Sequence, residues 1–200
     1  MGQGGKVMLT RRHFLQISTL TALTLPVWRC WGANATGPSP FELVEQWYAQ
    51  PADWVPNHPG LPIVHFRHAL AYDPLNAKLQ RSGWRMQWQG QPFAKPYFHS
   101  QAHVLHVVTA GTGVMQTGGD KGKQVQLRQG DLLFLPAGTG QQLLSADPRF
   151  QTQAWYPEKQ SWDVCRSALS TSAQCRQSAT TLSAASRKMM QAFGTQFLTT

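Results

Sequence analysis

The sequence has few acidic residues, no run of lysine and arginine, and no long apolar stretch. Its 200 residues include 18 basic and 9 acidic side chains, for a formal net charge of +9. The basic residues are scattered, so no helix face carries the cluster that nucleic-acid binding requires, and we expect no nucleic-acid partner. We find no internal repeat and no phosphate-binding glycine loop, since residues 118–122 (GGDKG) fit a hairpin turn better. The length suits one domain.

The first 35 residues contain no acidic residue, which argues against a folded amphipathic helix and for a targeting segment. Residues 10–16 read TRRHFLQ and resemble the twin-arginine export motif. Residues 17–28 follow as a modestly apolar segment, which is too short and too polar for a permanent membrane anchor. We therefore predict a twin-arginine signal peptide over residues 1–35, a periplasmic protein, and no membrane anchor after cleavage.

The predicted cleavage site is Ala33-Asn34-Ala35, which has the small-x-small pattern of signal peptidase sites, so the mature chain would start at Thr36. Removing Cys30 leaves Cys165 and Cys175 in a compartment where disulfides persist. Two interpretations stay open: a bridge closing this short loop, or two free thiols in a peripheral tail.

The mature chain divides into a short lead-in, a strand-rich centre and a polar tail. Residues 36–60 read as a linker and a short helix over 41–49, because a capping box begins at Ser39 and apolar residues recur at helical spacing. Residues 61–157 alternate short strands with glycine and proline turns. Residues 158–200 form a peripheral tail rich in Ser, Thr, Ala and Gln, with one helix predicted over 183–193.

The strand-rich centre predicts an all-β fold. Expected strands include 63–66, 84–88, 104–108 and 150–155, and in the second of these Trp84, Met86 and Trp88 would share one face. Strands this short and this regularly spaced are typical of a closed or sandwiched antiparallel barrel.

At the level of motifs the centre resembles the cupin superfamily. Residues 130–141 (GDLLFLPAGTGQ) keep the glycine, proline and glycine spacing of the second cupin motif at Gly130, Pro136 and Gly138, with Gln141 where the motif has histidine. Residues 96–108 (PYFHSQAHVLHVV) follow the first motif in outline, in two alternative registers. The resemblance implies a cupin-like jelly-roll β-barrel, and since cupins are often dimers, a homodimer stays open.

The histidines suggest a metal site, because the resemblance implies three histidines and a glutamate around a transition metal. Residues four apart on a strand share a face, so His99 and His103 would point together into the barrel and His106 would point away. A third ligand would come from His65, His68, Tyr97 or Gln141, and we name His99, His103 and Gln141 as the metal set for Fe, Mn, Zn, Ni or Cu. The alternative is a set of buried, hydrogen-bonded histidines with no metal.

The aromatic residues suggest a second kind of site. Trp84, Trp88 and Tyr97 are candidates to line a pocket for a small molecule at the barrel mouth, although any single aromatic residue more often simply fills the core. Our leading hypothesis is an exported cupin-domain protein that binds a small molecule in its barrel, with or without a transition metal. The alternative is a metal-dependent cupin enzyme, a dioxygenase, decarboxylase, isomerase or lyase.

A third hypothesis comes from residues 103–113, which resemble the ligand-binding domain of arabinose-type regulators. A regulator needs a DNA-binding module, and the tail after Pro157 is too short and too rich in Ser and Thr for paired helix-turn-helix units. We therefore rank this hypothesis below the other two.

Overall fold

The structure is a computed structural model, and it describes residues 41–67 and 75–193. These residues all belong to one compact unit of the chain, residues 37–200. The predicted signal peptide and its cleavage site lie outside the described residues, as does His68. The described strands are β1 (Glu42–Trp47), β2 (Ile63–Arg67), β3 (Trp84–Gly90), β4 (Val104–Ala110), β5 (Thr112–Thr117), β6 (Lys123–Arg128), β7 (Leu132–Leu135), β8 (Gln141–Ala146) and β9 (Gln151–Pro157).

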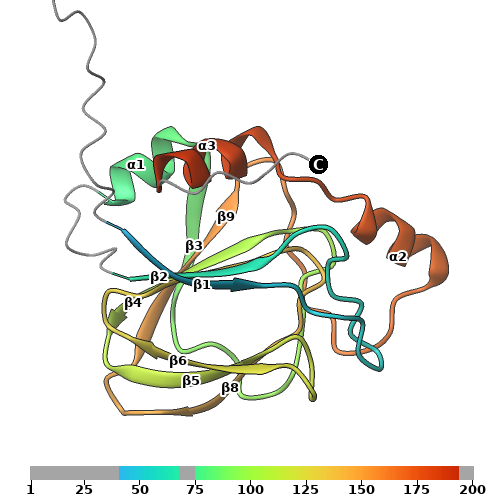
Figure 1. The fold of residues 1–200 in the computed structure, drawn as a ribbon, viewed down its shortest axis with the longest axis horizontal. Helices are drawn as coiled ribbons and strands as arrows, with labels where there is room; N and C mark the ends of the chain where they lie inside the picture. The colour runs from blue at the N-terminus through green and yellow to red at the C-terminus, as the bar shows by residue number, and fades with distance from the viewer. Residues whose placement is uncertain (1–40, 68–74, 194–200) are drawn as a thin grey trace, which may run out of the picture. The chain divides into compact units, whose positions relative to one another are not determined.

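These strands form two antiparallel sheets, which confirms the predicted all-β, cupin-like jelly-roll fold. One sheet has the strand order β1-β2-β7-β4-β9-β3 and the other β6-β5-β8. The three described helices, α1 (Leu75–Arg81), α2 (Thr171–Ser178) and α3 (Ala184–Ala192), come before β3 and after β9. In Figure 1, α1 and α3 lie on one side of the larger sheet, and β5, β6 and β8 lie on the other.

The central strands of the larger sheet, β2, β7 and β4, are buried on both faces and separate two cores. On β4, Leu105 and Val107 belong to the core on the helix side, whereas Val104 and Val108 belong to the core between the sheets. This alternation follows from the period of two along a strand. A strand buried on both faces reads as a continuous apolar run, as residues 104–108 do apart from His106.

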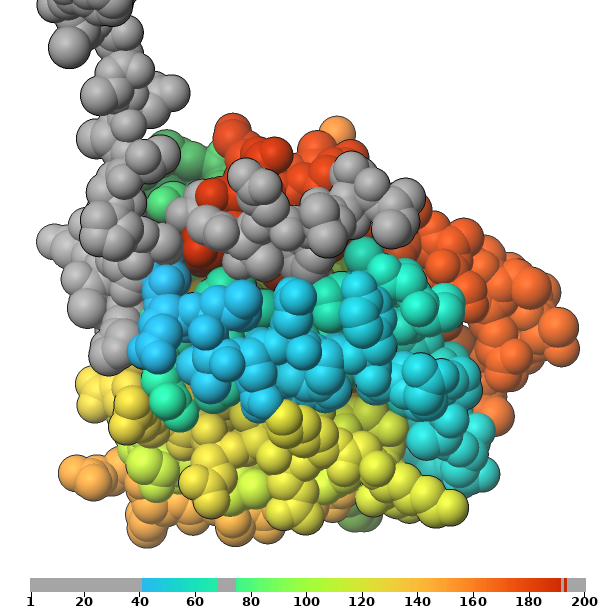
Figure 2. All heavy atoms as spheres, in the orientation of Figure 1, coloured from blue at the N-terminus to red at the C-terminus, as the bar shows by residue number. Residues whose placement is uncertain are grey.

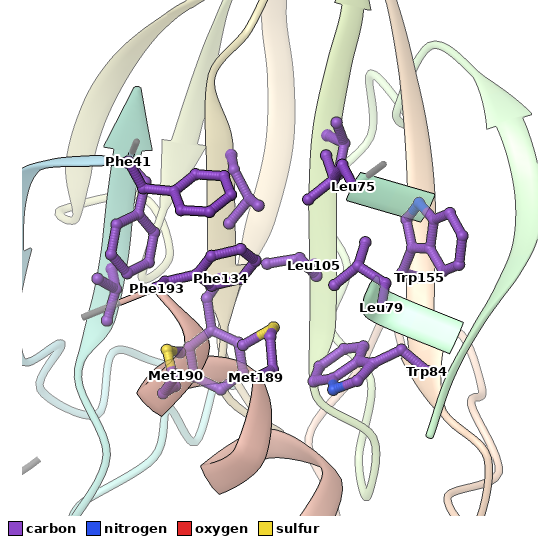
Figure 3. Close-up of a cluster of buried hydrophobic side chains, with 14 of the residues drawn as sticks. Phe41, Leu75, Leu79, Trp84, Leu105, Phe134, Trp155, Met189, Met190 and Phe193 are labelled. Carbon is purple, nitrogen blue, oxygen red and sulfur yellow. The ribbon is translucent and has the colours of Figure 1, made fainter. Parts of the chain in front are cut away.

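The helix-side core contains large aromatic and sulfur-bearing side chains, shown in Figure 3. Phe193, at the end of α3, packs edge-on against Phe41 with ring centroids 4.2 Å apart. Trp84 meets Phe134 at 6.4 Å. Leu75 and Leu79 of α1, one helical turn apart, are both buried in this core. Sequence analysis missed α1 and placed only strands in this part of the chain.

The helix expected over residues 41–49 is wrong, because residues 42–47 form strand β1. β1 pairs with β2 along its length, with a bulge between Leu43 and Glu45. Apolar residues three or four apart suggested a helix, but the pairing with β2 satisfies the backbone and the bulge shifts the alternation of faces. Pairing with β2 in the sheet therefore outweighs the helical pattern of residues 41–49.

The tail after β9 contains two helices. The predicted helix over 183–193 is confirmed as α3, whose N-cap Ser183 accepts a hydrogen bond from the backbone N–H of Ser186. On α2, the buried Gln177 side chain donates to the carbonyls of Ala137 (2.7 Å) and Asn57 (3.2 Å). Within the described residues, no helix is long and apolar enough to cross a membrane.

The bridge between Cys165 and Cys175 does not form in the structure, where both thiols are free. Cys165 instead donates from Sγ to the Asp163 carboxylate at 3.2 Å, and its backbone pairs with Phe98. Burial, with the nearby Asp163 carboxylate, raises the pKa of the Cys165 thiol to about 11. Cys175 is exposed on α2. Of the two interpretations, the structure shows the free thiols.

Candidate functional site

A cluster of polar and aromatic side chains gathers at one end of the space between the sheets. We call it the interior cluster; its members are Trp88, Tyr97, His99, His106, Gln141 and Tyr156. They come from β3, the segment before β4, β4 itself, β8 and β9. All are buried except Trp88, which is half-buried. Four of them, Trp88, Tyr97, His99 and Gln141, are residues that the sequence predicted for a site.

A chain of three hydrogen bonds fixes the direction of every proton around His99. The carbonyl oxygen of Asp163 can only accept, so Nδ1 of His99 donates to it and Nε2 is left as an acceptor. The Tyr156 hydroxyl therefore donates to Nε2 over 3.1 Å. Its oxygen in turn accepts from the indole N–H of Trp88 at 3.2 Å. Both ring nitrogens of His99 are thus engaged.

His106 is engaged at one nitrogen only. Its Nε2 donates to the side-chain oxygen of Gln141 at 2.9 Å, so Nδ1 carries a lone pair. That Nδ1 is buried and has no hydrogen-bond partner among the residues that the structure describes. Its ring lies edge-on to Trp88, with centroids 5.9 Å apart. His106 therefore offers an unused acceptor inside the barrel.

Tyr97 supplies the complementary group. Its backbone pairs with Gln141 in an isolated antiparallel bridge, so the two side chains lie on the same face. Its hydroxyl is buried and, in the described part of the chain, has no hydrogen-bond partner. A hydroxyl can donate, so Tyr97 and His106 offer one unused donor and one unused acceptor. Each costs about 1–3 kcal/mol while it stays unsatisfied.

The interior cluster is uncharged at neutral pH. Burial lowers the pKa of His106 to about 4 and lowers the pKa of His99, against the opposing effect of its hydrogen bond to Asp163. Burial raises the pKa of Tyr156 to about 12, and it also raises the pKa of Tyr97. These are the shifts that desolvation produces, since it disfavours whichever form carries charge.

A segment that we call the strap, residues 159–166, covers the cluster. Trp162 stacks on Tyr156 with ring centroids 5.4 Å apart and planes 22° apart. The Asp163 carboxylate accepts from the backbone N–H and the hydroxyl of Ser100, each at 2.7 Å. The Arg166 guanidinium lies 5.9 Å from the centre of the Tyr97 ring. The strap is exposed along most of its length and is held mainly by polar contacts.

His103 and Trp84, two other predicted site residues, lie on the opposite face of the larger sheet. His103 accepts at Nδ1 from the backbone N–H of Ala137 (3.0 Å) and faces the Thr181 carbonyl with Nε2 (3.2 Å). Its ring lies beside Phe134, in the helix-side core. The prediction that His99 and His103 point together is wrong, because the chain bends at Ser100 and Gln101 instead of running extended.

Trp84 and Trp88 do not share a face either. A bulge between Met86 and Trp88 inserts an extra residue, so that Met86 pairs with Trp155 and Trp88 with Ala154. Trp155 faces the helices, and Ala154 faces the space between the sheets. The expectation that Trp84 and Trp88 line one pocket is therefore wrong, and only Trp88 belongs to the interior cluster.

His106 and Tyr156 belong to the interior cluster although the sequence pattern did not predict them as site residues. The expectation that His106 points away was wrong because it assumed an unbroken strand from His99. Counted from Val104, which faces the space between the sheets, His106 falls on the same face. Tyr156 carried a similar signal, since it lies two residues after Ala154 in the last strand.

The side chains present do not fit the metal set that the resemblance implies. The interior cluster offers two imidazoles, two phenols and an amide, with no carboxylate side chain, and both nitrogens of His99 are engaged. His65, considered as a third ligand, instead meets the buried Asp131 carboxylate at 3.0 Å. In residues 41–67 and 75–193, no three His, Cys, Asp or Glu side chains come together in a way that could hold a metal ion.

The two-sheet fold and both motif regions define a cupin domain, and comparison with known proteins agrees. A family model described as "Cupin" (Cupin_6) matches residues 76–196, so the chain belongs to this cupin family. An uncharacterized protein of Bacillus subtilis (strain 168), YjlB, is 34% identical over 125 residues, which cover 62% of this chain and 76% of that protein.

Solved structures also match at low identity. Procruciferin, an 11S globulin from Brassica napus, is 16% identical over 54% of this chain and 23% of its own, with a TM-score of 0.32. A DUF861 family protein from Thermotoga maritima is 16% identical over 42% of this chain and 90% of its own, with a TM-score of 0.29. The chain spans 22% of the length of the coconut allergen cocosin and 24% of the length of an 11S allergen from Cocos nucifera, both of which it also matches.

Proposed function

We propose that this cupin-domain protein is exported to the periplasm and binds a small uncharged organic molecule in its barrel, against Tyr97 and His106. The observation that carries the proposal is a pair of buried groups without a partner among the described residues, the Tyr97 hydroxyl and Nδ1 of His106, in a cluster where His99 and Tyr156 are hydrogen-bonded. Buried polar groups without a partner are uncommon and costly, and binding sites are one place where they persist.

The chemistry of the cluster defines the ligand class. The ligand would accept a hydrogen bond from Tyr97 and donate one to His106, as a hydroxyketone, a hydroxylated lactone or a primary amide can. It would carry no charge, because the six side chains of the interior cluster are neutral and a buried charge needs a partner. Trp88 and Tyr156 would supply apolar contact area.

Entry of such a ligand requires the strap to move. A cavity beside Tyr97 and Gln141 has a volume of about 10 Å³, which is close to the space that one water needs; the loop between β5 and β6 also lines it, and neither His106 nor the strap does. The strap is itself exposed, although its polar contacts reach the buried residues His99 and Ser100, and exposed segments open at lower cost than core strands. Displacing Trp162 from Tyr156 would uncover the cluster from the solvent side.

Screening with hydroxyketones, hydroxylated lactones and primary amides tests the proposal. We expect one or more members of such a panel to raise the melting temperature of the periplasmic protein and to bind in calorimetry. Tyr97→Phe, which removes only the unused hydroxyl, should weaken that binding about tenfold or more. A panel without binders, or binders unaffected by Tyr97→Phe, would overturn the proposal.

A further inference from the structure

A second cavity lies outside the barrel, between the loop that follows β1 and the turn that joins β5 to β6. It has a volume of about 710 Å³ and is lined by residues 47–55 and by residues 117–118 and 120–123. Figure 2 shows the loop after β1 lying against the turn region on this face. The volume falls in the range of about 300–1,000 Å³ that is typical of small-molecule sites. We call this cavity the outer groove.

The loop that forms one wall of the outer groove is held in place by Asn57. The Asn57 side chain donates to the carbonyls of Gln50 (2.6 Å) and Gly118 (3.0 Å) and accepts from the backbone N–H of Gly140 (3.1 Å). It thereby joins the loop to the two turns beside it. Asn57 has φ +46°, which asparagine tolerates better than most residues. The wall is therefore organised before any ligand binds.

Aromatic side chains dominate this wall. Trp47, Tyr48 and Trp54 line the outer groove within eight residues of one another. Tyr48 is 58% exposed, which is unusual for so large an apolar surface. Trp54 is fixed by packing on Phe98 at 5.6 Å. The indole N–H of Trp47 is buried and has no hydrogen-bond partner among the residues that the structure describes.

The charges around the outer groove balance. Its lining includes two lysines, Lys121 and Lys123, and two aspartates, Asp53 and Asp120. Lys123 also pairs with Glu45 and lies 4.8 Å from the centre of the Trp47 ring. A groove of this kind does not select for charge. It offers flat aromatic surface together with hydrogen-bonding groups of both kinds.

From these features we infer that the outer groove binds a neutral saccharide. A pyranose ring presents C–H groups on its faces and hydroxyls around its edge, so one ligand can pack on Tyr48 or Trp54 and hydrogen-bond to Asp53 and Lys121. No member of the interior cluster lines the outer groove, and this inference does not depend on the function proposed for that cluster. Residues 47–55 precede the region matched by the cupin family model, residues 76–196, so the aromatic wall is a feature of this chain outside that match.

Saturation-transfer NMR and calorimetry on the periplasmic protein test this inference with glucose, galactose, mannose, N-acetylglucosamine and their disaccharides. We expect at least one of these sugars to bind and to change tryptophan fluorescence. Tyr48→Ala should weaken binding about tenfold, and Lys121→Ala should weaken it several-fold. Phe93→Ala removes an aromatic ring of similar exposure (48%) outside the outer groove and should leave the affinity unchanged.

Circular dichroism of each variant shows whether it is folded, and Tyr48 is exposed enough that its truncation should not unfold the protein. Tyr97→Phe separates the two sites, since it should leave saccharide affinity unchanged. The inference is overturned if no sugar in the panel binds, or if Tyr48→Ala binds as the wild type does. It is also overturned if only anions such as citrate bind and the Lys121→Ala variant loses them.

Discussion

The Tyr156 hydroxyl donates a hydrogen bond to Nε2 of His99 over 3.1 Å, and this contact separates the two buried tyrosines of the barrel into different roles. The Tyr156 hydroxyl both donates and accepts a hydrogen bond, because its oxygen also accepts from the Trp88 indole N–H. The Tyr97 hydroxyl is equally buried but, among the described residues, has no partner. The Tyr156 hydroxyl therefore stabilises the fold, whereas burial of the unpaired Tyr97 hydroxyl destabilises it.

The same substitution at these two positions should act in opposite directions. Tyr156→Phe leaves Nε2 of His99 and the Trp88 indole without partners, so we expect it to lower the free energy of unfolding by about 1–3 kcal/mol. Tyr97→Phe removes an unsatisfied hydroxyl at nearly constant shape and should leave stability unchanged or raise it by up to about 1 kcal/mol. Urea unfolding of both variants checks this, and equal destabilisation would contradict it.

The second cupin motif was the part of the site that the sequence predicted best. Gly130 and Gly138 both have positive φ, at +92° and +83°, so the motif spacing marks positions where the backbone requires glycine. The strand between them and the inward side chain of Gln141 follow from that spacing. The second motif could be predicted because the residues within each turn specify its conformation.

The predicted orientation of side chains was wrong where the strand alternation is interrupted. The bend at Ser100 and the bulge after Met86 each reverse the faces that follow, so His103 does not share a face with His99, nor Trp88 with Trp84. Asp163 holds Ser100 from the strap, far along the chain. A single interruption moves every later side chain to the other face, and no pattern within the strand reveals it.

Glycine substitutions in the second motif should differ in cost. At Gly130 an added Cβ meets nothing within 4 Å, so Gly130→Ala bears only the backbone cost of about 1–2 kcal/mol. At Gly138 the Cβ would also clash with the Gln177 side chain. Gln177 cannot move away without losing its bonds to Ala137 and Asn57, so we expect Gly138→Ala to cost about 1–3 kcal/mol more. Chemical unfolding measures both, and equal costs would contradict the role given to Gln177.

Export is testable apart from ligand binding. If residues 10–16 are a twin-arginine signal, replacing Arg11 and Arg12 together by lysine should keep the protein in the cytoplasm, whereas the wild type is recovered from the periplasm as a chain that starts at Thr36. Cell fractionation and N-terminal sequencing give both results. Replacing Lys6 by arginine, outside the motif, is the control, and a periplasmic double-lysine variant would contradict the prediction.

Stability should depend on pH through four buried histidines. Burial lowers the pKa of His58, His99, His103 and His106, the last two to about 4. Between pH 6.5 and pH 4 these histidines are protonated in the unfolded chain but not in the folded chain. The free energy of unfolding is therefore highest above pH 6.5 and decreases as the pH falls toward 4. We expect a loss on the order of 3 kcal/mol each for His103 and His106.

Urea unfolding across that range measures the loss. His103→Gln should be less stable at pH 7, because the contacts to Ala137 and Thr181 are broken, but its stability should fall less steeply with acid. A free energy of unfolding that stays constant from pH 7 to pH 4.5 would show that these histidines take up protons in the folded state.

Metal content is the measurement that separates the interior cluster from a metal centre. Metal binding at Nε2 of His99 would have to displace the Tyr156 hydroxyl, and binding at Nδ1 would have to displace the Asp163 carbonyl. Among the ring nitrogens of His99 and His106, only Nδ1 of His106 has a lone pair free of such competition from the described residues. We therefore expect elemental analysis of the periplasmic protein to give well under one equivalent of Fe, Mn, Zn, Ni or Cu, and dialysis against EDTA to leave the melting temperature unchanged. One equivalent that is lost in a His99→Ala, His106→Ala variant, and retained in His103→Ala, would replace the small-molecule site with a metal site built on these two histidines.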